Sequence, residues 1–198
     1  MQQTETNYET DLFMPIMKKL SEIVLIEYLG QMEFKVIADH IRTLTFALSD
    51  GASFENYGRG YVLRRLLRRA VRYLRKLGIN KPYLYTLVSK VADNMNNFYP
   101  YLKEKEEKVS KMIKNEEEKF AKTLSSGELM LRKIIENTDG DTISGEDAFK
   151  LYDTYGFPFE LTKEIAAESN KLVDEEGFIK EMDAQKERAR SSRGELQS

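Results

Sequence analysis

The sequence predicts a mostly α-helical protein, a multi-helix bundle-like fold that contains at most one very short strand pair. Two observations support this fold class. Apolar residues recur three and four positions apart along most of the 198 residues, which is the period of one helix face. Glycine, proline and Asn/Asp-rich turns, such as Gly30, Gly78, Pro100 and residues 137–141, fall between these periodic segments.

The expected helices follow one another with short breaks. Thr10 is the expected N-cap of the first helix, and Pro15 is tolerable because it lies near the start of that helix. Ser144 is the expected N-cap of a later helix, and Thr142–Ile143 just before it is the candidate short strand. The other helices are expected near residues 34–48, 60–78, 83–97, 101–137, 146–155, 160–169 and 175–190.

The long segment from Tyr101 to Asn137 carries an apolar stripe that is interrupted by Lys105, Glu116 and Gly127. A coiled coil would need an unbroken seam, so we interpret this segment as a helix packed along one neighbour. A boundary near Pro100 divides the chain into an N-terminal helical subdomain, residues 1–100, and a C-terminal one, residues 101–190. Residues 191–198 are expected to form a disordered tail.

The segment from Arg59 to Lys81 concentrates the positive charge of the chain. It holds seven arginines and two lysines and no acidic residue, whereas the chain as a whole has a net charge of −2. On a helix, its basic residues from Arg64 to Lys76 fall within an arc of roughly 140°, with leucine, alanine and valine on the opposite side. Arginine suits phosphate because its planar fork bonds two oxygens at once.

Two functional interpretations of this row remain open. In the first, the row binds nucleic acid or another phosphate ligand. In the second, it belongs to a helical protein-interaction or scaffold domain that docks an acidic partner. The row can also be neutralised by acidic residues elsewhere in the same fold. Carboxylates at i, i+4 spacing, which normally offset such a row, are missing from the segment itself.

Composition excludes several other classes. Without cysteine there is no disulfide framework, thiolate zinc site or cysteine nucleophile, and a single histidine excludes a multi-histidine metal site. No apolar run approaches the ~20 residues that span a bilayer, and the first residues lack a signal-peptide pattern, so we expect a cytoplasmic protein with no membrane partner. His40 has no accompanying nucleophile and is interpreted as part of a polar network.

Four segments together resemble alanyl-tRNA synthetase, a class II aminoacyl-tRNA synthetase. They occur in the order of that family and span about 150 residues. The matching stretches are Thr6–Phe13 (TNYETDLF), Val36–Arg42 (VIADHIR), Gly58–Arg72 (GRGYVLRRLLRRAVR) and Leu151–Pro158 (LYDTYGFP).

The resemblance implies the middle tRNA-recognition domain of such an enzyme, which grips the tRNA(Ala) acceptor stem. The catalytic domain, which uses ATP and magnesium to join alanine to its tRNA, would lie before residue 1, and the editing domain with its zinc site would lie after residue 198. This portion alone is therefore expected to be inactive, with no catalytic residue, metal ligand or cofactor of its own. Its partners would be the tRNA and those two domains.

The resemblance also implies site residues. The family recognises a G·U wobble pair in the acceptor stem, and Asn56 and Asp153 match its two base-reading positions. A carboxylate accepts hydrogen bonds only, which suits the guanine 2-amino donor in the shallow minor groove of an A-form stem. The candidates for backbone phosphate contacts, which fix register without reading sequence, are Arg59, Arg64, Arg65, Arg68, Arg69 and Arg72.

Overall fold

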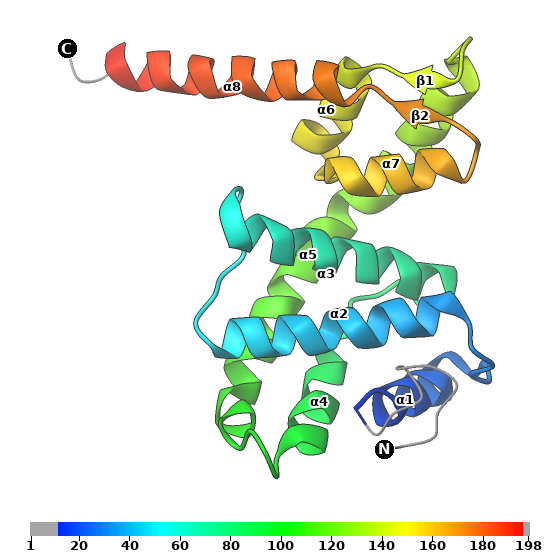
Figure 1. Ribbon diagram of the computed structural model, residues 1–198, viewed down its shortest axis with the longest axis vertical. Coiled ribbons are helices and arrows are strands. Elements are labelled where there is room, and N and C mark those ends of the chain that lie inside the picture. Colours follow the sequence, from blue (N-terminus) through cyan, green and yellow to red (C-terminus); the bar gives the residue numbers. More distant parts are fainter. Residues whose placement is uncertain (1–11, 196–198) are drawn as a thin grey trace. The chain divides into compact units, whose positions relative to one another are not determined.

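The computed structural model describes residues 12–195, with side chains through residue 192. Helices make up most of this part, which confirms the mostly α-helical fold (Figure 1). In order along the chain, the elements are α1 (Met14–Val24), α2 (Met32–Ser49), α3 (Gly58–Lys76), the 3₁₀ helix η2 (Leu84–Leu87), α4 (Val88–Met95), α5 (Tyr101–Asn137), β1 (Thr142–Ile143), α6 (Gly145–Tyr155), α7 (Phe159–Ala167), β2 (Leu172–Val173) and α8 (Glu175–Glu195).

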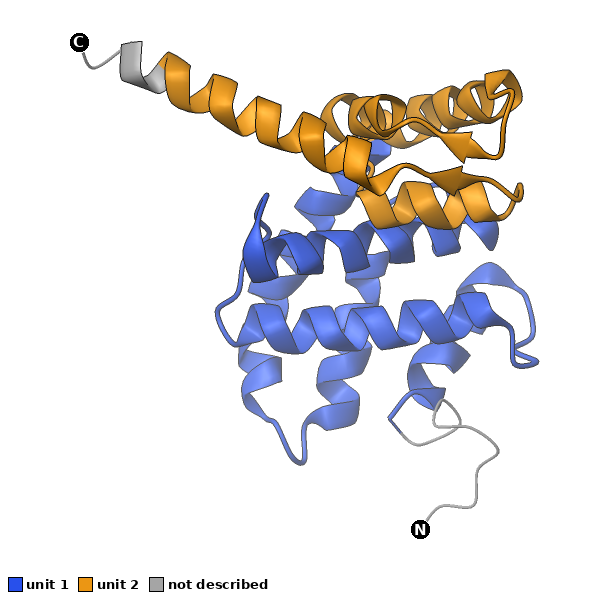
Figure 2. Cartoon of the chain, turned by 45° about the horizontal axis from the view of Figure 1, so that its top comes forward, with its two compact units in different colours: residues 1–121 blue, residues 122–198 orange. Residues whose placement is uncertain are grey.

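The chain divides into two compact units, residues 1–121 and residues 122–198 (Figure 2). The division falls inside α5, whereas the sequence placed a boundary near Pro100. The reason lies in the first half of α5, where Val109 and Ile113 are fully buried in the same core as α2 and α3. Residues 101–121 of α5 are therefore part of unit 1. The turn at Pro100 lies within this unit and does not separate two domains.

Unit 1 is built around α2 and α3, which pack along each other. The apolar face of α2 contributes Phe34, Ile37 and Ile41, and that of α3 contributes Leu67 and Ala70, all fully buried. This is the amphipathic pattern that the sequence predicted for both helices. Burial of such side chains stabilises the unit by roughly 1.5–3 kcal/mol for each large residue.

Helix ends in unit 1 follow local chemistry in part. Gly78 adopts a φ of +90° just after α3, where a left-handed residue closes the helix, as predicted. Helix α1 begins at Met14 with Pro15 in its first turn and Phe13 at the N-cap. The predicted N-cap, Thr10, lies outside the described residues.

Unit 2 contains the predicted strand pair. Strands β1 and β2 are parallel, with Thr142 opposite Leu172 and Ile143 opposite Val173. The Ser144 hydroxyl accepts a hydrogen bond from the backbone N–H of Asp147 at 3.1 Å, which confirms Ser144 as the N-cap of α6. Helix α8 continues through Glu195, past residue 190 where the sequence ended it, so residues 191–195 of the predicted tail are helical.

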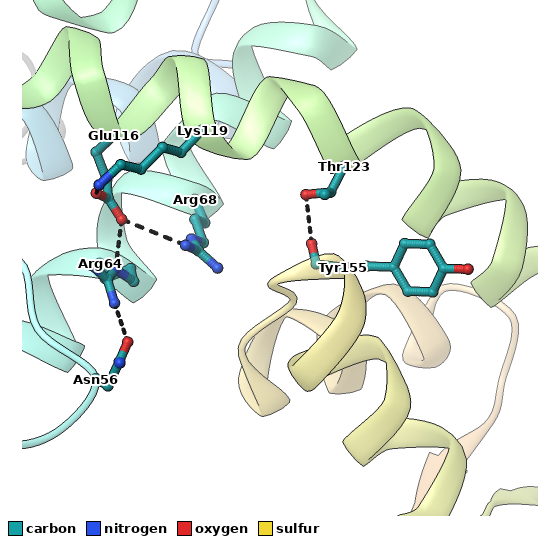
Figure 3. A network of polar contacts seen from close by, with 7 residues as sticks. All are labelled: Asn56, Arg64, Arg68, Glu116, Lys119, Thr123 and Tyr155. Carbon is teal, nitrogen blue, oxygen red and sulfur yellow. Dashed lines mark hydrogen bonds and ion pairs between the residues drawn. The ribbon is translucent and has the colours of Figure 1, made fainter.

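Gly127, one of the breaks in the α5 stripe, has a packing role in unit 2. A Cβ atom at this position would lie 2.5 Å from Cε1 of Phe157, whose ring is fully buried. The missing side chain therefore makes room for the ring. The Thr123 hydroxyl of α5 also donates to the Tyr155 carbonyl at 2.8 Å, which ties the end of α6 to α5 (Figure 3).

Candidate nucleic-acid interface

Helix α3 presents the basic row opposite its buried apolar face. Arg59, in its first turn, is exposed, and Arg65 is partly exposed. The hollow around the start of α3 is lined in part by Glu55, Tyr57 and Arg59. The N-terminal end of the helix and its flanking arginine therefore reach the surface.

Two of the candidate phosphate ligands bind a carboxylate of the same unit. Arg64 Nε donates to Glu116 Oε1 at 2.5 Å, and one terminal nitrogen of Arg68 lies 3.5 Å from the same oxygen (Figure 3). Glu116 is only 3% exposed. A buried carboxylate of this kind needs cationic partners, and losing one partner leaves an uncompensated charge. Arg64 and Arg68 thus hold α3 against α5, as the intramolecular interpretation anticipated.

Arg72 is also not a surface residue. It is 7% exposed, although the helical projection placed it on the same face as the other arginines. The expected exposed row is therefore wrong at this position, because the Arg72 side chain is buried within the fold. Phosphate contact by any of the six arginines remains a prediction.

His40 and Arg69 belong to one polar network with Asp39. Arg69 donates a terminal N–H to His40 Nε2 at 3.1 Å, so the histidine proton lies on Nδ1 and is donated to Asp39 at 3.1 Å. This hydrogen bond from His40 is the main reason why the pKa of Asp39 is lowered. The network links α2 to α3 and agrees with the interpretation of His40 as a polar-network residue.

Asn56 lies in the exposed loop before α3. Its side-chain oxygen accepts a hydrogen bond from Arg64, the same arginine that binds Glu116 (Figure 3). Gly60 allows the loop to pack closely, because a Cβ there would lie 2.5 Å from the Ser53 carbonyl oxygen. Glu116 therefore orients Arg64, and Arg64 orients the Asn56 amide, whose NH₂ group can only donate.

Asp153 lies in unit 2, near the C-terminal end of α6, and is exposed. One carboxylate oxygen, Oδ1, accepts a hydrogen bond from Nε2 of Gln185 on α8 at 2.6 Å. The two predicted base-reading residues thus belong to different units. Each is exposed and each is oriented by one neighbouring side chain.

Sequence reasoning missed Glu116 and Gln185, the residues that orient the site. A signal existed for Glu116, because a charged residue in the middle of an apolar stripe requires a buried partner. No pattern marked Gln185, because it is one polar residue on a highly charged helix.

Two kinds of feature are missing from the described part of the chain. Residues 12–195 contain no group of three or more acidic, histidine or cysteine side chains placed to hold a metal ion. In the same residues, every helix is too short or too polar to cross a bilayer.

Comparisons with known proteins agree with the resemblance. The family described as tRNA synthetases class II (A) matches residues 1–198. Among curated proteins, the alanine–tRNA ligases of Staphylococcus aureus strains JH9, Newman and USA300 are each 54% identical over 203 aligned residues, which cover 100% of this chain. The chain spans only 23% of the length of these relatives.

Proposed function

The chain belongs to the class II (A) family of tRNA synthetases, and we propose that it is the tRNA-recognition domain of an alanyl-tRNA synthetase. In this role it binds the tRNA(Ala) acceptor stem and reads a G·U pair with Asn56 and Asp153. The proposal places alanine, ATP, magnesium and zinc in other parts of the intact enzyme.

The observation that carries the proposal is the opposite chemistry of the two exposed side chains. The Asn56 oxygen is occupied by Arg64, which leaves an amide donor, and Asp153 keeps a second oxygen, which leaves a charged acceptor. In the minor groove, guanine offers a 2-amino donor, and a pyrimidine offers an O2 acceptor. In a G·U wobble pair the guanine 2-amino group has lost its usual hydrogen-bond partner on the opposite base. A protein carboxylate that accepts from this group therefore stabilises the complex more than it would with a G·C pair.

The geometry divides the arginines between two tasks. Arg64, Arg68 and Arg72 are held within unit 1, so we assign them to the fold and to the orientation of Asn56. Arg59 is exposed and is the proposed phosphate contact, whereas Arg65 and Arg69 are only partly exposed and stay candidates. Such contacts fix the register of a stem and supply affinity that falls with salt.

Titration of the chain with two acceptor-stem minihelices, identical except for G·U or G·C, tests the proposal at two salt concentrations. We expect tighter binding of the G·U stem, and Asp153→Ala to lower that preference by roughly 1–3 kcal/mol. Arg59→Ala should weaken the binding of both stems alike and make the salt dependence of the affinity shallower. Lys163→Ala, on the exposed surface of α7, is the control.

Equal affinity of the unmodified chain for both stems would refute base reading. Binding to acidic proteins but not to RNA would favour the interaction-domain alternative.

A further inference from the structure

We propose that Gln185 of α8 is a positioning residue for Asp153, and that it sets how strongly the chain prefers a G·U stem over a G·C stem. This inference rests on the proposed function and adds a residue that neither the sequence pattern nor the family resemblance singled out. It concerns unit 2 alone, because both side chains belong to that unit.

The contact between the two side chains is short and chemically unambiguous. Gln185 Nε2 lies 2.6 Å from Asp153 Oδ1, and a carboxylate can only accept, so the NH₂ end of the amide must face it. One oxygen of Asp153 is thereby fixed and the other keeps its lone pairs. An exposed carboxylate without such a bond samples several rotamers, and a ligand must then offset the cost of ordering it.

The face of α8 that carries Gln185 is the face that packs on α6. Phe178, Met182 and Gln185 are spaced four and three residues apart, so they share one side of the helix. The Phe178 ring lies between aromatic side chains, with centroid distances of 5.7 Å to Tyr152 and 4.8 Å to Phe159. Gln185 therefore lies next to this hydrophobic contact, on the same face of α8 and closer to the surface.

Two glycines fix the register of this contact. A Cβ on Gly145 would lie 2.1 Å from the backbone nitrogen of Phe178, so α6 and α8 touch through their backbones next to Gly177. Gly145 and Gly177 are 32 positions apart, and Asp153 and Gln185 have the same separation. The two helices thus run side by side in the same direction, in constant register, over about 12 Å.

The strand pair sets that register at the start of both helices. β1 and β2 are parallel and lead directly into α6 and α8, and the Asp174 amide donates to the Ile143 carbonyl at 2.9 Å. Asp174 also accepts from the Gly177 amide at 3.0 Å, which fixes the first turn of α8. Strand pairing, glycine contact and aromatic packing therefore all determine where Gln185 meets Asp153.

The test measures the ratio of affinities for the G·U and G·C minihelices in five forms of the chain: unmodified, Gln185→Ala, Gln185→Glu, Asp153→Ala and the double alanine variant. Ser191→Ala, a polar-to-alanine change on the exposed surface of the same helix, is the matched control. Gln185→Ala should lower the preference about tenfold, the equivalent of one good hydrogen bond to a charged group. The double variant should lose no more than Asp153→Ala alone.

Gln185→Glu adds a readout that a purely structural role would not change. Two facing carboxylates repel, and together they retain a proton more strongly, so the preference should be low near about pH 7.5 and recover toward about pH 5.5. Gln185→Ala should show no such recovery, because it has no group to share a proton.

The outcomes separate the two proposals. If Asp153→Ala abolishes the preference while Gln185→Ala leaves it intact, base reading stands and the positioning role of Gln185 is overturned. If the unmodified chain shows no preference, or Asp153→Ala retains it, the proposed function fails and the role of Gln185 fails with it. Additive losses in the double variant would show that Gln185 acts independently of Asp153, which also overturns the inference.

Discussion

Glu117 should make the stability of unit 1 decrease as pH rises from acidic to neutral values. Its carboxylate is buried and accepts three backbone N–H bonds at the start of η2, from Tyr83 at 3.0 Å, Leu84 at 2.7 Å and Tyr85 at 3.1 Å. Burial disfavours the charged form and raises the pKa of Glu117 from 4.5 to about 7, although the three amides act in the opposite direction.

The sign follows from proton binding in the two states. Below about pH 4.5 the carboxyl is protonated in the folded and unfolded chain alike, so it contributes no pH dependence. Between about pH 4.5 and 7 the folded chain keeps a proton that the unfolded chain has released, and stability falls as pH rises. Summed over this interval at 1.36 kcal/mol per pH unit, the loss is about 3 kcal/mol.

Glu117→Gln removes the titration and isolates this effect. Its oxygen can still accept from the Tyr83 and Leu84 amides, but its NH₂ group faces the Tyr85 amide, so at low pH the variant should be less stable by about 1–2 kcal/mol. As pH rises, the free energy of unfolding of the unmodified chain should fall while that of Glu117→Gln stays constant. The two values should therefore converge or cross near neutral pH. Urea denaturation followed by circular dichroism across this pH range measures the difference.

The control is Glu107→Gln, an exposed position on the same helix, for which the difference should be nearly independent of pH. A constant difference for Glu117→Gln would refute the reasoning, because it would mean that burial does not perturb the carboxyl. A difference that grows with pH in favour of the unmodified chain would show that the three amides outweigh burial.

Other substitutions test the packing and the polar networks. Gly127→Ala should destabilise the chain by about 1–3 kcal/mol because its Cβ would meet the Phe157 ring, whereas Gly140→Ala, with nothing within 4 Å, should not. Glu116→Gln should lower the free energy of unfolding by about 3 kcal/mol, since two guanidinium groups lose their buried carboxylate. Asp39→Asn should lower the free energy of unfolding by less than about 1 kcal/mol at neutral pH, because this carboxyl is half-exposed. The difference should be still smaller in acid, because the pKa of Asp39 is lowered by His40 and its stabilising effect is lost as pH falls. Urea denaturation measures all three.

The helices and their faces could be predicted because they depend on local chemistry. The periodicity of α2 and α3, the glycine after α3 and the serine cap of α6 each act within about one helical turn, and the structure confirms them. One strand of the pair, Thr142–Ile143, was also visible as a two-residue segment before a helix cap, but its partner Leu172–Val173 was not. The charged row of α3 was predicted as a row, but the residues that neutralise part of it were not.

What the sequence could not supply is contact between distant segments. Glu116 is 52 residues from Arg64 and Gln185 is 32 residues from Asp153, so no spacing rule joins them. Glu116 and Gly127 were noted only as interruptions of a coiled-coil seam. In the structure one binds arginines and the other admits an aromatic ring, so each interruption marks a specific contact.

Some arginines of α3 bind a carboxylate of the same unit because burying an unpaired charge is unfavourable. A helix with many arginines and no acidic residue of its own repels itself, and packing it into a core requires a counter-charge. Glu116 supplies that charge to Arg64 and Arg68, and Arg64 in turn fixes the Asn56 amide, so the group that stabilises α3 also orients a proposed reading residue. A phosphate contact by Arg64 or Arg68 would compete with the ion pair to Glu116 that holds α3 against α5. The number of arginines in a basic segment is therefore not a count of exposed cations, because some of them bind a buried carboxylate of the same unit.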